Sequence, residues 1–183
     1  MDEKRVFVAI DISEAARGAV TEHMSRLREL YPNIRARWAA AANLHITMRF
    51  VGNVDPFQLK ELNECVRTTA HAFEEFELTL AETGNFGRRR DRTDTLWIGV
   101  EAADGRLGAM ASALEDGPSR KFVPHLTIAR IKDARGAGPM IEEHLSSDFQ
   151  PASFIVRELV IYESTLTPTG SVYSVLSKHQ LKS

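Results

Sequence analysis

Apolar and polar positions alternate along much of the chain in short stretches, which is the pattern of strands with one buried face. The predicted strands are RVFVAID, RARW, LHITMRFVG, EFELTLAE, DTLWIGVE, VPHLTIAR, SFIVRELVIYES and SVYSVLSK. Apolar residues at helical spacing predict helices after Ser13 up to Pro32, from Asp55 to Phe73, from about Asp104 to Leu114 and from about Pro139 to Leu145. Ser13 and Asp55 are favourable N-cap residues, and Pro56 suits a first helical turn.

The order of these elements bears on the fold class. Helices and strands follow one another irregularly, and several strands are joined without a helix between them. This order favours an α+β fold with mainly antiparallel sheets over a parallel doubly wound sheet. No linker rich in Pro, Gly or Ser divides the chain, so residues 1–183 are expected to form a single domain.

The only internal repeat is a strand that carries His-x-Thr, found in NLHITMRF (43–50) and again in VPHLTIAR (123–130). Successive side chains of a strand point to opposite faces. The expected polar face of the first copy therefore carries His45, Thr47 and Arg49. Its expected packed face carries Leu44, Ile46, Met48 and Phe50. Two such strands are consistent with two lobes that each line one side of a shared cleft.

In the second copy, His125 and Thr127 share a face, whereas Arg130 is out of phase with them. A bulge or a strand end is needed to bring Arg130 to the same side. The two copies are thus similar without being identical.

Two histidines that face each other suit in-line displacement at phosphorus. An unperturbed imidazole has a pKa near 6.5, so one ring can be neutral and accept a proton while the other is charged and donates one. The hydroxyls of Thr47 and Thr127 can donate hydrogen bonds to the phosphate oxygens on which negative charge builds up. This chemistry requires no metal and no cofactor. The other histidines, His23, His71, His144 and His179, are interpreted as surface or packing residues.

Composition limits how a polyanion can be bound. The net charge is -2 and the isoelectric point is near 6.3, so nucleic acid must be attracted by a local cluster of cations. Such a cluster occurs in GNFGRRRDRT, where Arg88, Arg89, Arg90 and Arg92 follow Phe86. The arginines can track an RNA backbone while Phe86 stacks on a base. The alternative is a solvated hairpin tip that Phe86 anchors.

The opening residues MDEKRVFVAID lead directly into a strand, without the apolar segment of a signal peptide. No apolar run in the sequence is long enough to span a membrane. We therefore expect a soluble, cytoplasmic protein, and we expect it to act as a monomer with no membrane and no obligate protein partner.

The two motifs, as HITM and HLTI, resemble those of the two-histidine (2H) phosphoesterase superfamily. Their surroundings resemble its bacterial and archaeal RNA 2',3'-cyclic phosphodiesterases, also called 2'-5' RNA ligases. The resemblance extends over nearly the whole chain, through RVFVAID, RW before NLHITMRFVG, GNFG before TLWIGV, FVPHLTIAR and IYESTLTPTGSVYSVL. It implies two lobes related by a pseudo-two-fold axis, each an antiparallel sheet backed by helices, with the active-site cleft between them.

The resemblance also implies an activity, which is hydrolysis of RNA 2',3'-cyclic phosphate ends to 2'-phosphomonoesters without a metal or nucleotide cofactor. His45 would donate a proton to the departing 3'-oxygen, and His125 would accept one from water. Thr47 and Thr127 would hold the phosphate, with an added contact from Arg130.

Other functions stay open at this point. The same site can accept a small cyclic nucleotide in place of an RNA end. A metal-dependent hydrolase is disfavoured because neither motif has the H-E-x-x-H or clustered carboxylate pattern of a coordination shell. In a non-catalytic RNA-binding module, the arginine cluster would be the functional feature and the paired histidines would be incidental.

Overall fold

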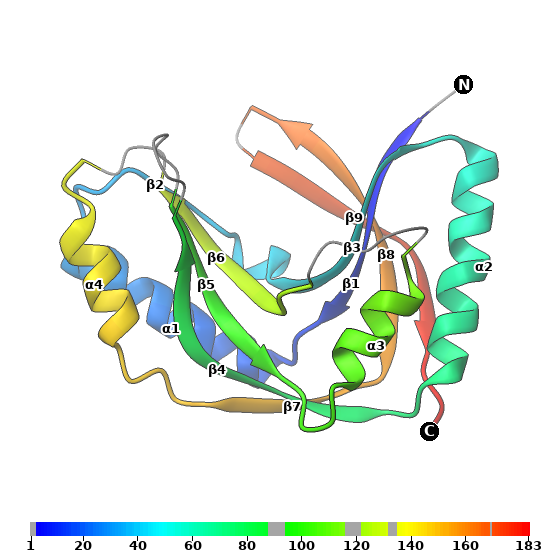
Figure 1. Cartoon of the computed structure of the whole chain (residues 1–183). Helices are drawn as coiled ribbons and strands as arrows, with labels where there is room; N and C mark the ends of the chain where they lie inside the picture. Colours follow the sequence, from blue (N-terminus) through cyan, green and yellow to red (C-terminus); the bar gives the residue numbers. More distant parts are fainter. Residues whose placement is uncertain (1–2, 88–93, 116–121, 132–134, 169) are drawn as a thin grey trace.

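The computed structural model describes residues 3–87, 94–115, 122–131, 135–168 and 170–183. They form two mainly antiparallel sheets that diverge from a common base (Figure 1). Sheet A has the strand order β3-β1-β8-β9 and sheet B the order β2-β6-β5-β4-β7. The strands of sheet A are β1 (Lys4–Asp11), β3 (His45–Val54), β8 (Glu158–Thr167) and β9 (Gly170–Gln180). Those of sheet B are β2 (Ala36–Trp38), β4 (Phe76–Phe86), β5 (Asp94–Glu101), β6 (His125–Ile131) and β7 (Ala152–Val156).

Helices back both sheets, so the expected α+β fold class is confirmed. Helix α2 (Pro56–Ala72) contacts β3, β8 and β9 of sheet A, while α1 (Glu14–Leu30) contacts β7 and α4 (Gly138–Ser146) contacts β4 of sheet B. The predicted caps are present. The Ser13 hydroxyl accepts a hydrogen bond from the Ala16 amide, and Asp55 and Gln58 form a capping box.

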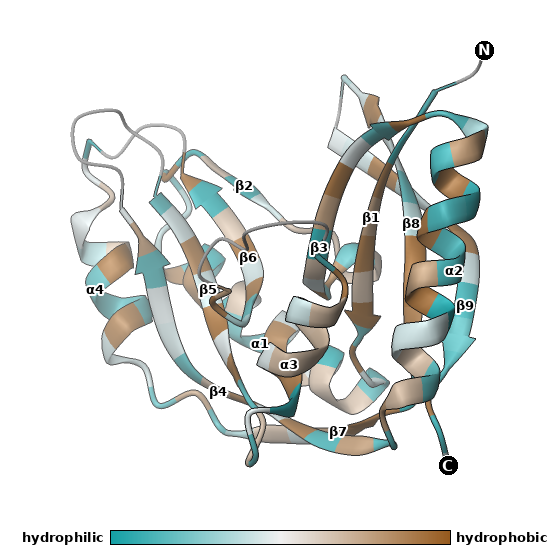
Figure 2. Ribbon diagram, turned by 45° about the vertical axis from the view of Figure 1, so that its right-hand side comes forward, coloured by the Kyte–Doolittle hydropathy of each residue, from teal (hydrophilic) through white to brown (hydrophobic). Residues whose placement is uncertain are grey.

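Strand β1 lies inside sheet A, and its middle residues are buried on both faces. Val6, Val8 and Ile10 pack with the main core, whereas Phe7 and Ala9 point to the opposite face and are also almost fully covered. Figure 2 shows the resulting concentration of apolar residues along β1 and β8. We call the face that carries Phe7 and Ala9 the inner face of sheet A, because α2 covers the other one.

The segment SFIVRELVIYES was expected to be one strand, and this is wrong. It forms β7 and β8, which belong to different sheets: β7 pairs with β4, and β8 pairs with β1 and β9. The chain passes between the sheets at Arg157, whose carbonyl accepts a hydrogen bond from the Leu181 amide. Continuous alternation cannot reveal such a change of partner, because both halves keep a polar and an apolar face.

Strand β4 is longer than the sequence indicated, because Thr83 to Phe86 continue it into the segment expected to be a loop. A bulge at Glu82, which has a positive φ of 62°, separates the two halves of this strand. The second half pairs with β5 from Thr95 to Ile98. Phe86 is therefore held by a sheet and is not part of a free loop.

A buried pair of histidines ties α1 and α4 to sheet B. His23 Nε2 lies 2.9 Å from His144 Nδ1, and His144 Nε2 lies 3.1 Å from the Gly84 carbonyl and 3.2 Å from the Trp97 carbonyl. Carbonyls only accept, so His144 Nε2 carries the proton and His144 Nδ1 accepts one from His23. Burial, followed by the nearby His144 and Arg26, lowers the pKa of His23 to about 4. Both rings are therefore neutral near pH 7, in agreement with a packing role.

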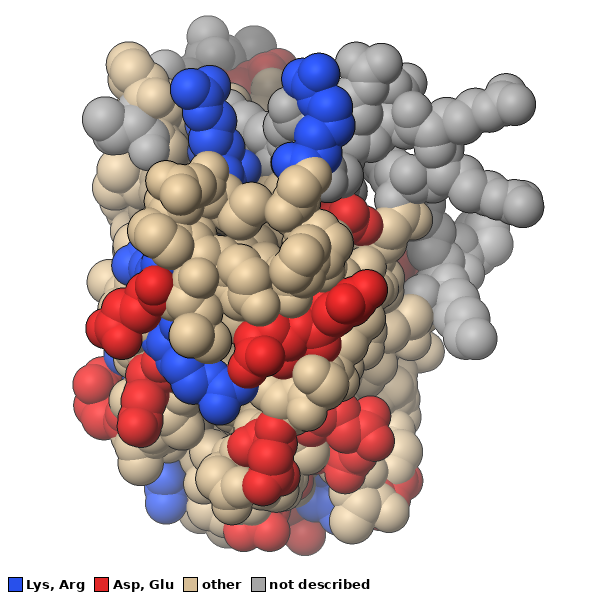
Figure 3. Space-filling model, turned by 90° about the vertical axis from the view of Figure 1, so that its left-hand side faces the viewer, with Lys and Arg blue, Asp and Glu red and all other residues tan. Residues whose placement is uncertain are grey.

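The charge distribution agrees with the low net charge. Figure 3 shows one end of the molecule, on which basic side chains stand at the upper edge and also lie between the acidic ones of the middle and lower parts. Within the ranges described above, no helix has the length and apolar character needed to cross a membrane.

Candidate functional site

The two His-x-Thr motifs meet where the sheets adjoin. Strand β3 carries the first motif and lies at the edge of sheet A, and it contacts β6, which carries the second. His45, Thr47, His125 and Thr127 are all half-buried, and they alternate with fully buried residues on the same strands. The two imidazoles are close enough for the charge of one to lower the pKa of the other. The predicted juxtaposition of the histidines is thus present.

A bulge follows the motif in β3 and changes which side chains share its face. Ala9 of β1 pairs with Thr47, but Val8 pairs with Arg49, so Met48 is the extra residue. Arg49 consequently turns away from Thr47, and its Nη1 donates a 2.5 Å hydrogen bond to the carbonyl of Leu114. Phe50 pairs with Phe7 and is 72% exposed. The expected faces of Arg49 and Phe50 were therefore wrong, because strict alternation does not allow for an inserted residue.

The corresponding bulge in β6 brings Arg130 into phase. Trp97 of β5 pairs with Thr127 and Leu96 pairs with Ala129, so Ile128 is the extra residue. Arg130 then pairs with Thr95, two residues from Trp97 on the same strand, and its side chain is exposed. The sequence left open whether a bulge is present, and the structure contains one at the required place.

The His45 ring is held by its own strand. Its Nδ1 lies 2.6 Å from the carbonyl of Asn43, so this nitrogen carries a proton. Its Nε2 lies 3.0 Å from the Thr47 hydroxyl. In the neutral ring Nε2 accepts from that hydroxyl, and in the charged ring Nε2 becomes a donor.

His125 is held in the same way, because its Nδ1 lies 2.7 Å from the carbonyl of Val123. In both motifs the carbonyl two residues before the histidine thus fixes the tautomer and leaves Nε2 for proton transfer. The sequence could not show this hydrogen bond, because the acceptor is a backbone carbonyl that any residue carries.

The electrostatic surroundings of His45 are mixed. Burial is the main influence and lowers the pKa of His45 below its usual value. The hydrogen bond to Asn43 and the carboxylate of Asp11 act in the opposite direction, and the charge of His125 adds to the lowering. Asp11 is the register partner of His45 and accepts hydrogen bonds from the Tyr162 hydroxyl at 2.7 and 2.9 Å. Asp11 closes β1 and was not predicted to lie at the site, because only the pairing of β1 with β3 places it beside His45.

Aromatic side chains surround each histidine. On sheet A the Phe7 ring centre lies 4.9 Å from that of His45 and 5.4 Å from that of Tyr162, and Tyr173 contacts His45 edge-on at 5.4 Å. None of these rings was predicted to lie at the site. They come from strands that are distant in sequence, and only the order of strands in the sheet brings them together.

On sheet B, Phe86 and Trp97 lie beside His125. The Phe86 ring meets the His125 ring edge-on, with 4.9 Å between the ring centres. It lies tilted against the Trp97 ring, with 5.3 Å between the ring centres. Trp97 lies over Gly84, where an added Cβ would be 2.1 Å from the nearest ring atom, so this position requires glycine. Phe86, which is 39% exposed, thus packs against both His125 and Trp97, and its stacking on an RNA base stays a prediction. The predicted binding residues Arg88 and Arg90 lie outside the described residues.

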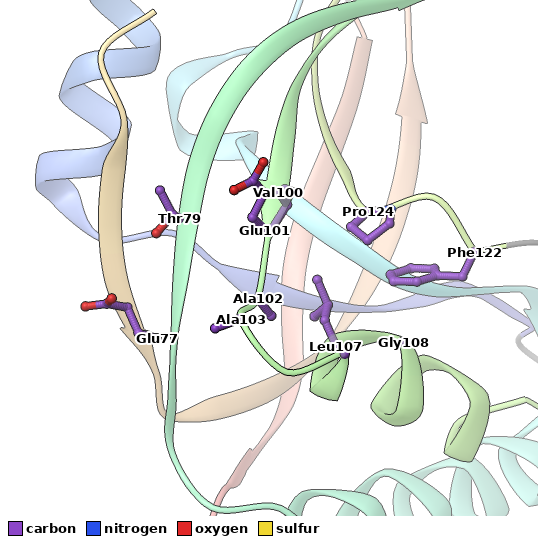
Figure 4. Close-up of a pocket in the computed structure, with 11 residues that line it drawn as sticks. Glu77, Thr79, Val100, Glu101, Ala102, Ala103, Leu107, Gly108, Phe122 and Pro124 are labelled. Atoms are coloured by element: carbon purple, nitrogen blue, oxygen red, sulfur yellow. The ribbon is translucent and has the colours of Figure 1, made fainter.

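A cavity of about 570 Å³ borders the segment that leads into His125. Figure 4 shows Thr79 and Glu101 on one side of it and the rings of Phe122 and Pro124 on the other. Glu77 also lines this cavity. Carboxylates disfavour a phosphate group, so this cavity does not extend the site along an RNA backbone.

Across the described ranges, His, Cys, Asp and Glu do not gather in groups of three or more that could hold a metal ion. The groups at the site include two imidazoles, the hydroxyls of Thr47 and Thr127, the guanidinium of Arg130 and the carboxylate of Asp11.

Comparison with known proteins gives consistent matches. A family model described as the 2'-5' RNA ligase superfamily matches residues 16–167. The chain is 33% identical to the RNA 2',3'-cyclic phosphodiesterase of Thermotoga maritima over 97% of its own length and 96% of the relative. It is 30% identical to the enzyme of the same name from Methanothermobacter thermautotrophicus, over 97% and 98% of the two chains.

Solved structures give the same result. The crystal structure of E. coli LigT in its apo form superposes over 100% of both chains, with a TM-score of 0.76 and 25% identity. The resemblance thus covers both sheets and is not confined to the two motifs.

Proposed function

The chain belongs to the 2'-5' RNA ligase superfamily, and we propose that it hydrolyses RNA 2',3'-cyclic phosphate ends to 2'-phosphomonoesters by acid and base catalysis from His45 and His125. The observation that carries the proposal is the meeting of two anchored imidazoles, each with a threonine on the same face, at the contact of β3 and β6. When a 5'-hydroxyl replaces water as the nucleophile, the same displacement of the 3'-oxygen joins two ends through a 2'-5' linkage.

In the proposed reaction, His125 Nε2 accepts a proton from water as the water oxygen attacks phosphorus. The bond from phosphorus to the 3'-oxygen breaks, and the protonated Nε2 of His45 gives its proton to that oxygen. The resemblance to the family assigns these two roles. Burial is the larger influence and lowers the pKa of His45, and the carboxylate of Asp11 partly offsets this lowering in favour of the charged form that a proton donor needs.

Three side chains are proposed to bind the phosphate. Thr47 and Thr127 donate hydrogen bonds to its non-bridging oxygens, and the hydrogen of the Thr47 hydroxyl is available for this when His45 Nε2 is protonated and no longer accepts it. Arg130 shares the face of Thr127 in sheet B and adds a charged donor. Arg88 and Arg90 remain a sequence-based prediction for contacts with the RNA backbone.

We further propose that residues 1–183 act as one bilobal domain, in the cytoplasm and as a monomer. Buried apolar side chains from both sheets belong to one continuous core cluster, which supports a single folding unit.

The test is incubation of the purified protein with a short RNA that ends in a 2',3'-cyclic phosphate, in the presence of a chelator. The proposal predicts quantitative conversion to the 2'-phosphomonoester. A 3'-phosphate product, or turnover that stops when metal is removed, would contradict it.

A further inference from the structure

Arg17, one turn into α1, is directed at the backbone of neighbouring segments. Its side chain is only 18% exposed. Nη1 donates one hydrogen bond to the carbonyl of Ala41 and another, of 3.5 Å, to the carbonyl of Leu44. Nη2 donates one of 3.4 Å to the carbonyl of Ile12, and Nε lies 3.3 Å from the Glu14 carboxylate. We call the three hydrogen bonds to carbonyls the Arg17 contacts.

Two of the Arg17 contacts end on the segment that leads into the first motif. Ala41 and Leu44 lie on either side of Asn43, which ends a single turn of 3-10 helix. The carbonyl of Asn43 is the group that holds His45 Nδ1. The guanidinium therefore fixes the backbone on both sides of the carbonyl that anchors the histidine.

The third contact ends beside the carboxylate that pairs with His45. Ile12 directly follows Asp11, the register partner of His45. Burial and then Asp11 raise the pKa of Tyr162, and the charge of Arg17 acts in the opposite direction, so the guanidinium lies near this hydrogen-bonded pair. One side chain of α1 thus joins the end of β1 to the start of β3.

Arginine suits this role because its planar group carries five N–H donors in a fixed arrangement. It can bond two segments at once, and a charged donor makes each bond stronger than a neutral donor would. Most of these donors are already directed at the three carbonyls and at Glu14, which leaves little capacity for a substrate phosphate. The geometry therefore favours a role in holding the backbone over a role in binding RNA.

We propose that Arg17 is a positioning residue for His45. By joining the end of β1 to the segment before β3, it fixes the Asn43 carbonyl and thereby directs Nε2 of His45 at the substrate. This inference rests on the proposed function, in which His45 donates a proton to the departing oxygen. A general acid acts only within hydrogen-bond reach of that oxygen. Loss of the Arg17 contacts should therefore slow the proton transfer and leave binding of the phosphate nearly unchanged.

The first measurement separates positioning from substrate binding. The wild-type protein, Arg17→Met and Arg17→Lys are assayed for kcat and KM on adenosine 2',3'-cyclic phosphate, with circular dichroism to establish that each is folded. Arg67→Met is the matched control. Arg67 on α2 forms the same kind of ion pair, with a glutamate three residues before it, and its side chain is 53% exposed.

The second measurement is the tautomer of each motif histidine, which needs no turnover. The ¹⁵N chemical shifts of the imidazole nitrogens are recorded at about pH 8, where an ordinary imidazole is neutral. Signals are assigned by their loss in His45→Ala and in His125→Ala. A ring anchored by a carbonyl keeps its proton on Nδ1, whereas a released ring exchanges it between both nitrogens. His125 is the internal control, because the carbonyl of Val123 anchors it.

We expect Arg17→Met to lower kcat by about 10- to 10²-fold, the cost of a slightly misplaced catalytic group, and to change KM by less than about 3-fold. The His45 signals should shift toward those of a ring that exchanges between tautomers, while the His125 signals stay in place. Arg17→Lys keeps the charge without the planar fork, so it should recover at most part of the rate. Arg67→Met should match the wild type in every measurement.

A raised KM with an unchanged kcat would overturn the proposal, because Arg17 would then contact the substrate. A lower kcat with an unchanged His45 tautomer would overturn it as well, since the loss would not arise from the anchor. Wild-type values in Arg17→Met or in Arg17→Lys would show that the Arg17 contacts are not needed together. If Arg17→Met does not fold, Arg17→Lys is judged by the same criteria.

The proposed function can fail separately. If the wild-type protein does not hydrolyse the cyclic phosphate, the proposed activity is wrong, and the tautomer of His45 in Arg17→Met alone decides whether Arg17 positions the ring. If the wild-type protein is active and Arg17→Met keeps both its rate and its tautomer, the activity stands and the positioning role is rejected.

Discussion

At each motif histidine, one ring nitrogen is held by the backbone and the other is left for chemistry. The carbonyls of Asn43 and Val123 fix Nδ1 as a donor, so Nε2 is the nitrogen that changes protonation. The residue types and their spacing predicted this pair from the sequence. The anchoring carbonyls and the charge of Asp11 could not be predicted, because they depend on local backbone geometry and on the pairing of β1 with β3.

The threonines are expected to matter less than the histidines, since each supplies one hydrogen bond and no proton transfer. Thr47→Val and Thr127→Val should each lower the hydrolysis rate by about 10- to 10³-fold. Steady-state rates on a cyclic-phosphate substrate give the measurement, with the exposed Thr165→Val as control. Wild-type rates in both variants would limit the threonines to strand packing.

Asp11 should set the pH at which His45 titrates. Its carboxylate raises the pKa of His45, so Asp11→Asn should lower that pKa further. The profile of kcat/KM against pH should be bell-shaped, and the limb that includes His45 should move to lower pH in the variant. Asp148→Asn removes the same charge from an exposed loop position between α4 and β7 and should leave the profile in place. A profile unaffected by Asp11→Asn would show that the carboxylate does not act on His45.

At the level of elements, alternation and capping residues predicted most strands and helices, and the bulges were the main source of error. The inserted residue at Met48 changes the faces of Arg49 and Phe50, up to a second register shift before Gly52, and the one at Ile128 changes the faces of the residues after it in β6. The bulge at Met48 places Phe50 on the inner face of sheet A, and the bulge at Ile128 places Arg130 on the same face as Thr127. The strand boundary at Arg157 was also not predicted, because two strands of different sheets follow each other there directly.

The contact of β4 with β5 depends on a glycine. Gly84→Ala would place a Cβ against the Trp97 ring, so we expect a loss of about 1–3 kcal/mol in the free energy of unfolding. We also expect a lower rate of hydrolysis, because Trp97 borders Phe86 and His125. Gly18→Ala is the matched control, since nothing lies within 4 Å of its added Cβ in α1. That change should stabilise the protein by up to about 1 kcal/mol. Urea unfolding and steady-state rates measure both, and a fully stable, active Gly84→Ala would show that the strands can separate at no cost.

At the level of the whole molecule, the site exists because two sheets place one edge of sheet A beside β6. The sequence repeat indicated two lobes, and the order of strands within each sheet was beyond what local patterns can show. The aromatic rings around His45 come from β1, β8 and β9, so they could be assigned to the site only once that order was known.

The buried histidine pair should make stability depend on pH. Burial depresses the pKa of His23 to about 4 and also lowers that of His144, while both rings titrate near 6.5 in the unfolded chain. The unfolded state therefore binds more protons at acid pH, and stability is complete above about pH 6.5 and is lost as the pH falls toward 4. The loss from His23 alone should be on the order of 2–3 kcal/mol.

Urea unfolding between pH 4.5 and 7.5 tests this dependence. His23→Phe should be less stable at pH 7 but should show a shallower slope against pH, because one buried titrating ring is removed. His71→Gln, at an exposed position of α2, should keep the wild-type slope. An identical slope in all three proteins would mean that other groups control acid unfolding.

The central claim is that His45 and His125 act together as acid and base, and single substitutions test it most directly. His45→Ala and His125→Ala are compared with His71→Ala by the rate of hydrolysis of an RNA 2',3'-cyclic phosphate, with circular dichroism to establish that each variant is folded. The account predicts that each motif variant loses at least about 10²- to 10⁴-fold in rate while His71→Ala matches the wild type. A folded His45→Ala or His125→Ala protein with near wild-type turnover would contradict the paired-histidine mechanism.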